Sequence, residues 1–310
     1  MSIVERAAEF RGPFPQTHPR HSGAAAATAS VEPSLIERAI SDRSSRPDPA
    51  NDRNSSEGPR AEGRAERPAG KTGKMLKIDL EKLRQQSIVT PAGERTMMGE
   101  SFRRIKRQIL ANVANPAAGV ATNLVMVTSS LAGEGKTFCS ANLAISIAME
   151  MDRTVLLVDA DVARPAVPRT LGIEVGKGLM DVLLDPSIDL ADVMCRTDIE
   201  KLSILPAGTG HRRATELLAS ERMHALLEEM AKRYSDRVII FDSPPLLAAS
   251  EAAVLASRMG QIVMVVEAGK TSEHDLKDAL RRIESCDIVG VVLNKGGVTN
   301  SGSYYGAYGA

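Results

Sequence analysis

A short apolar run followed by a glycine-containing loop most constrains the fold of this 310-residue chain. Residues 124–128 are apolar or β-branched, and the loop after them ends in Gly133-Glu134-Gly135-Lys136-Thr137. Glycines let backbone N–H groups turn towards phosphate oxygens, and a helix starting near Lys136 adds the positive end of its dipole. Lys136 is expected to reach the β- and γ-phosphates, and the Thr137 hydroxyl to bind Mg²⁺. The sequence therefore predicts a P-loop, although Ser130 stands where its first glycine usually lies.

Short β-rich runs alternate with helical patterns over the rest of the chain. Several runs are apolar on both faces, as expected of strands in a parallel sheet that helices cover. The predicted strands are 124–128, 154–158, 202–205, 238–241, 262–266 and 288–293. Helical periodicity marks 97–110, 136–150, 214–234 and 272–285. This order predicts a three-layer α/β domain, a P-loop NTPase fold with a mostly parallel sheet, over residues 75–299.

Composition excludes several classes of protein. Lys+Arg and Asp+Glu both total 39, and this zero net charge gives no support to a dedicated nucleic-acid binder. The three cysteines are far apart, which excludes a disulfide scaffold or a structural zinc site and suits the reducing cytosol. No apolar run approaches the roughly 18 residues that span a bilayer, and the first residues lack the apolar stretch of a signal peptide.

Residues 1–74 differ in composition from the rest of the chain. They hold half of the 16 prolines and only two aromatic residues, so they cannot bury enough apolar surface to offset chain entropy. We predict a disordered arm. Two related pieces, 3–7 and 35–39, could each form an amphipathic turn or two on a partner, or be a coincidence of composition.

Two further strand ends carry carboxylates. Asp159 and Asp161 follow the run 154–158, and Asp242 follows 238–241. Ligands bind at the carboxyl edge of open α/β sheets, where these residues are expected. Asp242 fits the role of fixing Mg²⁺, while Asp159 and Asp161 could share metal coordination and accept a proton from an attacking hydroxyl. Capping of a following helix is the alternative for this pair.

The four tyrosines of the chain are unevenly distributed. Three of them, Tyr304, Tyr305 and Tyr308, lie within the last seven residues, in a Gly/Ser-rich segment that offers no core to pack against. Exposed phenols on a flexible segment suit phosphotransfer between subunits, because the acceptor must enter a neighbour's active site. A low-complexity tail or an interaction peptide is the alternative. We predict a flexible tyrosine tail over residues 300–310.

Together these motifs resemble the bacterial tyrosine kinase (BY-kinase) family, whose members use a P-loop fold in place of the eukaryotic kinase architecture. The resemblance spans residues 75–310 and is strongest to tyrosine autokinases encoded with exosortase-type exopolysaccharide systems. The matching segments are Ser129–Thr137, Asp159–Pro165, Leu205–Gly208, Glu216–Ser220, Asp242–Pro245 and Leu293–Lys295.

The resemblance assigns roles to these residues and implies ATP and Mg²⁺ as cofactors. Walker A is Gly133–Thr137, Walker A′ contains Asp159 and Asp161, and Walker B ends at Asp242. The implied catalytic residues are Lys136, Asp159 and Asp161. The implied nucleotide-binding residues are Gly133, Glu134, Gly135, Lys136, Thr137, Phe138 and Asn294, the last at the adenine-reading position of related ATPases. The implied metal ligands are Thr137, Asp159 and Asp242.

The predicted helix 97–110 carries the implied oligomerisation motif, Glu-x-x-Arg-x-x-Arg in the family. Its apolar residues share one face, and the basic residues on the others form either a solvated surface or an interface. Glu100 and Arg103 match the motif, while Lys106 replaces the last arginine, with Arg107 beside it. Lysine cannot reproduce a bidentate arginine contact, so that contact is weaker or is made by Arg107.

The resemblance also implies a function, partners and a location. It implies a cytoplasmic protein-tyrosine autokinase, peripheral at the inner membrane, that regulates exopolysaccharide or capsule biosynthesis and export. The implied partners are copies of the chain in a ring, an inner-membrane polysaccharide co-polymerase (a chain-length regulator) and a tyrosine phosphatase, without nucleic acid. The competing family is the MinD/ParA-type ATPases, whose signature P-loop lysine is replaced here by Leu131. A nucleotide-gated scaffold with a docking tail is a third interpretation.

Overall fold

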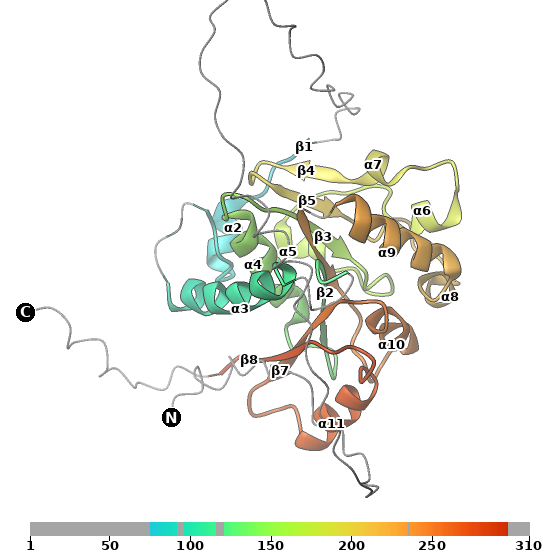
Figure 1. Cartoon of the computed structure of the whole chain (residues 1–310). Helices are drawn as coiled ribbons and strands as arrows, with labels where there is room; N and C mark the ends of the chain where they lie inside the picture. The colour runs from blue at the N-terminus through green and yellow to red at the C-terminus, as the bar shows by residue number, and fades with distance from the viewer. Residues whose placement is uncertain (1–74, 92, 94–95, 116–120, 235, 297–310) are drawn as a thin grey trace, which may run out of the picture. The chain divides into compact units, whose positions relative to one another are not determined.

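The described part of the chain builds one eight-stranded sheet in the order β1-β4-β5-β3-β6-β2-β7-β8 (Figure 1). The computed structural model describes residues 75–91, 93, 96–115, 121–234 and 236–296. The predicted arm 1–74 and the tyrosine tail 300–310 lie outside the described residues. All described residues belong to one compact unit.

Six neighbouring strands of the sheet, from β5 to the edge strand β8, run parallel. They are β2 (Leu124–Ser129), β3 (Thr154–Asp159), β5 (Leu202–Leu205), β6 (Arg237–Asp242), β7 (Gln261–Glu267) and β8 (Val289–Asn294). Each predicted strand is confirmed to within one residue at either end. The sequence missed two short strands at one end of the sheet, β1 (Met75–Leu76) and β4 (Cys195–Thr197), because they are too short for a periodic pattern. β4 pairs antiparallel with β5, and β1 pairs parallel with β4.

Helices cover both faces of the sheet, which confirms the predicted three layers. Four pack on one face: α2 (Leu80–Gln85), α3 (Met97–Val113), α4 (Lys136–Ala148) and α5 (Val167–Leu171). Six pack on the other: α6 (Leu179–Leu184), α7 (Leu190–Val193), α8 (Ala214–Leu218), α9 (Glu221–Arg233), α10 (Ser250–Ala256) and α11 (Glu273–Arg281). Strand β2 is buried on both sides, with Val125 facing the first layer and Met126 the second. Among these helices none is long and apolar enough to cross a membrane.

The prediction of a single helix over 214–234 is wrong. The structure contains two helices, α8 and α9, that meet at Ser220. The Ser220 hydroxyl donates to the Leu217 carbonyl at 2.7 Å and accepts from the Met223 N–H at 3.3 Å, so it serves the ends of both helices. Apolar residues continue across the junction, which is why the periodic pattern did not reveal it.

Helix α3 lies against α4, and the contact buries a charge. Phe102 and Ile109 of α3 are buried in the core, and Lys106 is buried with them. The Lys106 ammonium donates to the Ser146 carbonyl at 2.8 Å and pairs with Glu150 Oε1 at 2.6 Å. Ser146 lies in the last turn of α4, where carbonyls lack partners within the helix. Lys106 therefore closes the end of α4 within its own chain.

We predict that Lys106 contributes to stability rather than to contacts with other subunits. Lys106→Ala removes a charged hydrogen bond to a helix end and should lower the free energy of unfolding by about 2 kcal/mol, measured by urea denaturation. Arg107→Ala, on the exposed side of the same helix, is the matched control and should change it by less than about 0.5 kcal/mol. Equal effects of the two substitutions would contradict this assignment.

Candidate nucleotide-binding site

The loop between β2 and α4 leaves backbone N–H groups free at the start of a helix. Gly133 and Gly135 have φ values of 89° and 96°, in the left-handed region that glycine tolerates. Gly135 is the N-cap of α4, and no side chain caps the helix. The first N–H groups of a helix have no intrahelical partner, so they are available to an anion. This is the geometry that the predicted P-loop requires.

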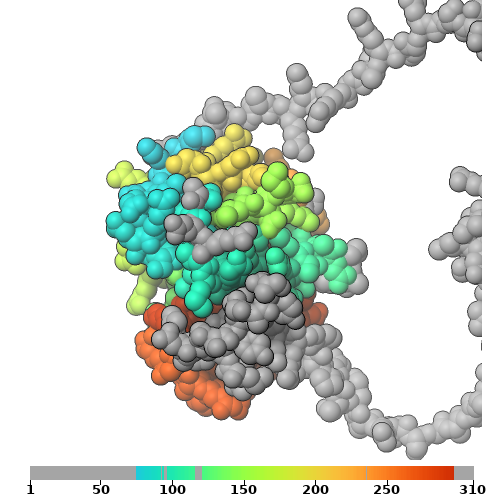
Figure 2. Space-filling model, turned by 90° about the vertical axis from the view of Figure 1, so that its left-hand side faces the viewer, coloured from blue at the N-terminus to red at the C-terminus, as the bar shows by residue number. Residues whose placement is uncertain are grey.

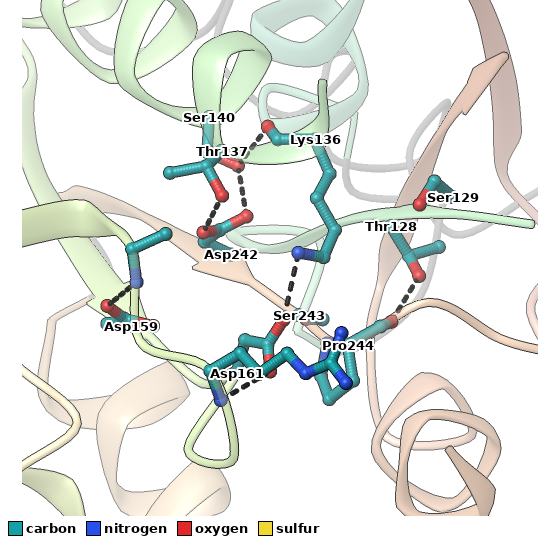
Figure 3. A network of polar contacts seen from close by, with 12 residues as sticks. Thr128, Ser129, Lys136, Thr137, Ser140, Asp159, Asp161, Asp242, Ser243 and Pro244 are labelled. Atoms are coloured by element: carbon teal, nitrogen blue, oxygen red, sulfur yellow. Dashed lines mark hydrogen bonds and ion pairs between the residues drawn. The ribbon is translucent and has the colours of Figure 1, made fainter. Parts of the chain in front are cut away.

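Lys136 begins α4 and points along the carboxyl edge of the sheet. Its Nζ lies 2.8 Å from Asp161 Oδ2, and both side chains are largely buried (Figure 3). Asp161 also accepts from the backbone N–H of Arg164 at 3.2 Å, which fixes the turn that follows β3. The structure therefore brings two of the predicted catalytic residues into direct contact.

Asp242, at the end of β6, lies under the start of α4. One of its oxygens accepts from the Thr137 hydroxyl at 2.6 Å and the other from Ser140 Oγ at 3.2 Å (Figure 3). Burial raises the pKa of Asp242 to about 6, although the Lys136 charge and the two hydroxyls act in the opposite direction. Sequence analysis did not select Ser140, although it lies three residues after Thr137 and so on the same helix face.

Asp159 ends β3 directly beside Asp242, with which it pairs in the sheet register. Its Oδ2 accepts from the N–H groups of Ala166 and Val167, both at 3.0 Å, so it supports the start of α5 as the capping alternative proposed. Its Oδ1 is buried and has no hydrogen-bond partner among the described residues. Burial and the nearby Asp242 carboxylate raise the pKa of Asp159 to about 7. Asp159 thus combines a structural contact with an unused acceptor.

These groups fit a magnesium ion bound partly by phosphates. Within the described ranges, no three His, Cys, Asp or Glu side chains converge as a complete metal site. Mg²⁺ is typically bound by one or two carboxylates together with water and substrate phosphates. Asp242, the Thr137 hydroxyl and the unpartnered Oδ1 of Asp159 supply such an incomplete set beside the P-loop.

The remaining predicted nucleotide residues lie in different surroundings. Asn294, at the end of β8, donates from Nδ2 to the Glu134 carbonyl at 2.9 Å, and a Cβ at Gly135 would lie 2.1 Å from that nitrogen. Glu134 is buried and accepts from the Leu131 N–H at 2.8 Å. Phe138 faces α3 instead, with its ring centroid 6.2 Å from that of Phe102. Asn294 and Glu134 therefore shape the loop itself, while Phe138 packs against the core.

The four residues of the predicted oligomerisation motif do not share one environment. Glu100 and Arg103 form an ion pair with each other on α3. Arg107 is exposed, whereas Lys106 is directed into the chain as described above. The exposed surface of α3 therefore presents Glu100, Arg103 and Arg107 but not Lys106.

Comparisons with known proteins identify the family. A family model described as an AAA domain matches residues 122–295. Tyrosine-protein kinase YwqD of Bacillus subtilis is 30% identical over 227 residues, which cover 73% of this chain and 92% of that protein. The chain belongs to the bacterial tyrosine-kinase family.

Further relatives agree with this assignment. Tyrosine-protein kinase CpsD of Streptococcus agalactiae is 32% identical over 195 residues, which cover 62% of this chain and 82% of that protein. The solved BceF tyrosine kinase domain is 28% identical, with a TM-score of 0.58 over 71% of this chain and 91% of that domain. The mostly parallel sheet between two layers of helices confirms the P-loop NTPase fold that the sequence predicts.

The raised carboxyl pKa values predict that the kinase, free of nucleotide and divalent metal, loses stability as the pH rises. The folded chain holds the protons of Asp159 and Asp242 more tightly than the unfolded chain, where an aspartate has a pKa of about 4. The contribution of these two protonated carboxyl groups to the free energy of unfolding is therefore fully present below about pH 4. It is lost as the pH rises through about 6 to 7. Asp159→Asn removes the charge and should stabilise this form at pH 8 by roughly 2–4 kcal/mol.

Urea denaturation in EDTA between pH 5 and pH 8 measures this effect. The Asp159→Asn chain should show a flatter pH dependence than the wild type. Asp152→Asn, at an exposed aspartate in the turn before β3, is the control and should follow the wild-type curve. An Asp159→Asn curve parallel to that of the wild type would show that Asp159 is ionised throughout this range.

Proposed function

We propose that this chain transfers the γ-phosphoryl group of ATP to tyrosines of its own C-terminal segment, between subunits. The observation that carries the proposal is the 2.8 Å contact between Lys136 and Asp161. In a P-loop the lysine binds the β- and γ-phosphates, so a carboxylate touching that lysine lies beside the group that is transferred. A carboxylate at this position can accept a proton from an attacking hydroxyl.

Different residues of the site bind the phosphates, accept the proton and hold the metal. The N–H groups of the P-loop and the start of α4 bind the phosphates, and Lys136 moves from Asp161 to the phosphate oxygens. This movement frees Asp161 to orient the tyrosine hydroxyl and accept its proton. Asp159, whose carboxylate interacts electrostatically with that of Asp161, is the proposed second acceptor. A bound Mg²⁺, held by Thr137, Asp242 and Asp159, would offset negative charge on the phosphates.

Tyr304, Tyr305 and Tyr308 are the proposed acceptors, and they lie outside the described residues. The fourth tyrosine, Tyr234, follows α9 and is engaged by two arginines, with the guanidinium of Arg237 4.6 Å and that of Arg233 5.7 Å from its ring centroid. Tyr234 precedes the start of β6, whereas Asp242 of the site lies at the end of that strand, and this separation favours the C-terminal tyrosines. Each added phosphate brings about −1.5 to −2 charges, and repulsion from the acidic site would then release a modified tail.

We further propose that subunits assemble through the exposed surface of α3. The surface of α2 and α3, blue to green in the colour bar, faces the viewer in Figure 2. Glu100, Arg103 and Arg107 are available there, whereas Lys106 closes the end of α4. In the proposed ring, the tail of one subunit would enter the site of the next.

We also propose a biological setting for the kinase, which its family membership supports. In this setting the kinase works in the cytoplasm at the inner membrane, beside a polysaccharide co-polymerase, and a tyrosine phosphatase reverses its modification. It regulates the synthesis and export of an exopolysaccharide or capsule.

Loss of Lys136 should abolish phosphotyrosine. In Lys136→Ala we expect at least a 100-fold fall in the rate, roughly the effect of losing one electrostatic contact to a transition state. Intact-mass measurement with peptide mapping of residues 296–310 reads out the modification. Lys232→Ala, at an exposed lysine on α9, is the control and should be modified like the wild type. An unmodified wild-type chain, even with ATP, Mg²⁺ and a co-polymerase partner, together with free phosphate release, would favour a switch ATPase of the MinD/ParA kind.

Two defective chains should complement each other if transfer occurs between subunits. One chain carries Lys136→Ala with its tail intact, and the other carries Tyr304→Phe, Tyr305→Phe and Tyr308→Phe with its site intact. Neither should become phosphorylated alone, whereas the mixture should acquire phosphate on the Lys136→Ala chain only. Phosphate on the tail variant alone would identify another acceptor, and Tyr234 is the remaining tyrosine.

A further inference from the structure

Side chains that lie at or just after the ends of β7 and β8 contact the P-loop on the side to which its carbonyl groups point, here called the outer side. We infer that Lys295, acting on the Gly133 carbonyl, and Thr271, acting on the Glu134 carboxylate, are positioning residues that hold the P-loop in the phosphate-binding orientation before nucleotide arrives. Neither Lys295 nor Thr271 was among the predicted site residues. The inference rests on the proposed use of a nucleotide at this loop, but not on the identity of the acceptor.

Side chains from the end of β8 and the residue after it fix the direction of two P-loop peptide groups. Lys295 Nζ donates to the Gly133 carbonyl at 2.7 Å, and Asn294 Nδ2 donates to the Glu134 carbonyl at 2.9 Å. In a trans peptide the C=O of one residue and the N–H of the next point in opposite directions. When both carbonyls are held from outside, the N–H groups of Glu134 and Gly135 face the inner side of the loop. That is the side on which phosphate oxygens bind.

Glu134 brings a negative charge into the P-loop itself. A carboxylate in a phosphate-binding loop repels the ligand unless it is held away. Glu134 is only 2% exposed, and its carboxylate accepts from the Leu131 N–H at 2.8 Å and from the Thr271 hydroxyl. The Thr271 oxygen accepts from the Glu267 N–H at 2.9 Å, which leaves its proton for Glu134. Thr271 therefore secures this carboxylate on the outer side of the loop.

The backbone of Lys295 adopts a conformation that is unusual for a lysine. Its φ is 57°, in the left-handed region that a lysine rarely adopts, and its ammonium also pairs with Glu267 Oε2 at 3.2 Å. Such a conformation persists where surrounding contacts fix it, and it is typical of functional sites. Glycine relaxes this backbone but has no ammonium. A substitution to glycine therefore separates the effect on the P-loop from the effect on stability.

The test uses Lys295→Gly and Thr271→Val in the full chain. Calorimetry gives the affinity for ADP in MgCl₂, and thermal unfolding without nucleotide gives stability. Lys295→Gly should bind on the order of tenfold more weakly, which is the loss of one charged hydrogen bond, while its unfolding midpoint stays the same or rises. Thr271→Val, which removes a hydroxyl but no formal charge, should also bind ADP more weakly. Thr271→Ser keeps the hydroxyl and should bind ADP with wild-type affinity.

Lys201 provides a matched control. It is also a lysine with a positive φ, 68°, and its Nζ donates to the Glu150 carbonyl at 3.0 Å, away from the P-loop. Lys201→Gly should therefore bind ADP like the wild type.

Wild-type affinity in both Lys295→Gly and Thr271→Val would overturn the inference and leave the proposed function intact. The inference would also be overturned if weaker binding were accompanied by a lower unfolding midpoint, or if Thr271→Ser did not restore the affinity. Either result would indicate general destabilisation of the chain. A wild-type chain that binds no ADP would instead refute the proposed function, and the inference with it.

Discussion

The balance between one lysine and three buried aspartates governs this site. The register of β3 against β6 places Asp159 beside Asp242, and the turn after β3 adds Asp161. Burial and mutual repulsion favour the protonated forms of Asp159 and Asp242, and Lys136 is the cation that the chain itself supplies. A divalent cation would stabilise such a site by offsetting the negative charge, and bound phosphates would draw the lysine away from Asp161. The chemistry proposed here follows from that imbalance.

The same edge of the sheet is rigid because the strands beneath it are buried on both faces. β2 and β6 lie at the centre of the sheet, between two layers of helices, so the ends of these strands are fixed relative to one another. The P-loop itself has little core of its own. Polar contacts from Asn294, Lys295 and Thr271 reach it from the neighbouring strand ends. A rigid edge and a supported loop together keep the phosphate-binding groups in place.

The sequence predicted the elements whose signals are long or local. Six strands, three layers and the P-loop were predicted because apolar runs and glycine spacing report them directly. Prediction from the sequence failed where an element is too short to give a pattern, or where a contact joins residues far apart in the chain. Strands β1 and β4 are too brief for a pattern, and the junction at Ser220 interrupts a helix without interrupting its apolar face.

The sequence by itself determined the family, the residues at the carboxyl edge and the uneven placement of tyrosines, because these depend on residue type and order along the chain. Only the tertiary structure decided which side chains meet. It directed Lys106 into the end of α4, paired Lys136 with Asp161, and brought Thr271 and Lys295 to a loop more than a hundred residues earlier in the chain. The physical reason is that hydrogen bonds and ion pairs act over a few ångströms of space, and proximity in space between distant residues is a property of the packed fold.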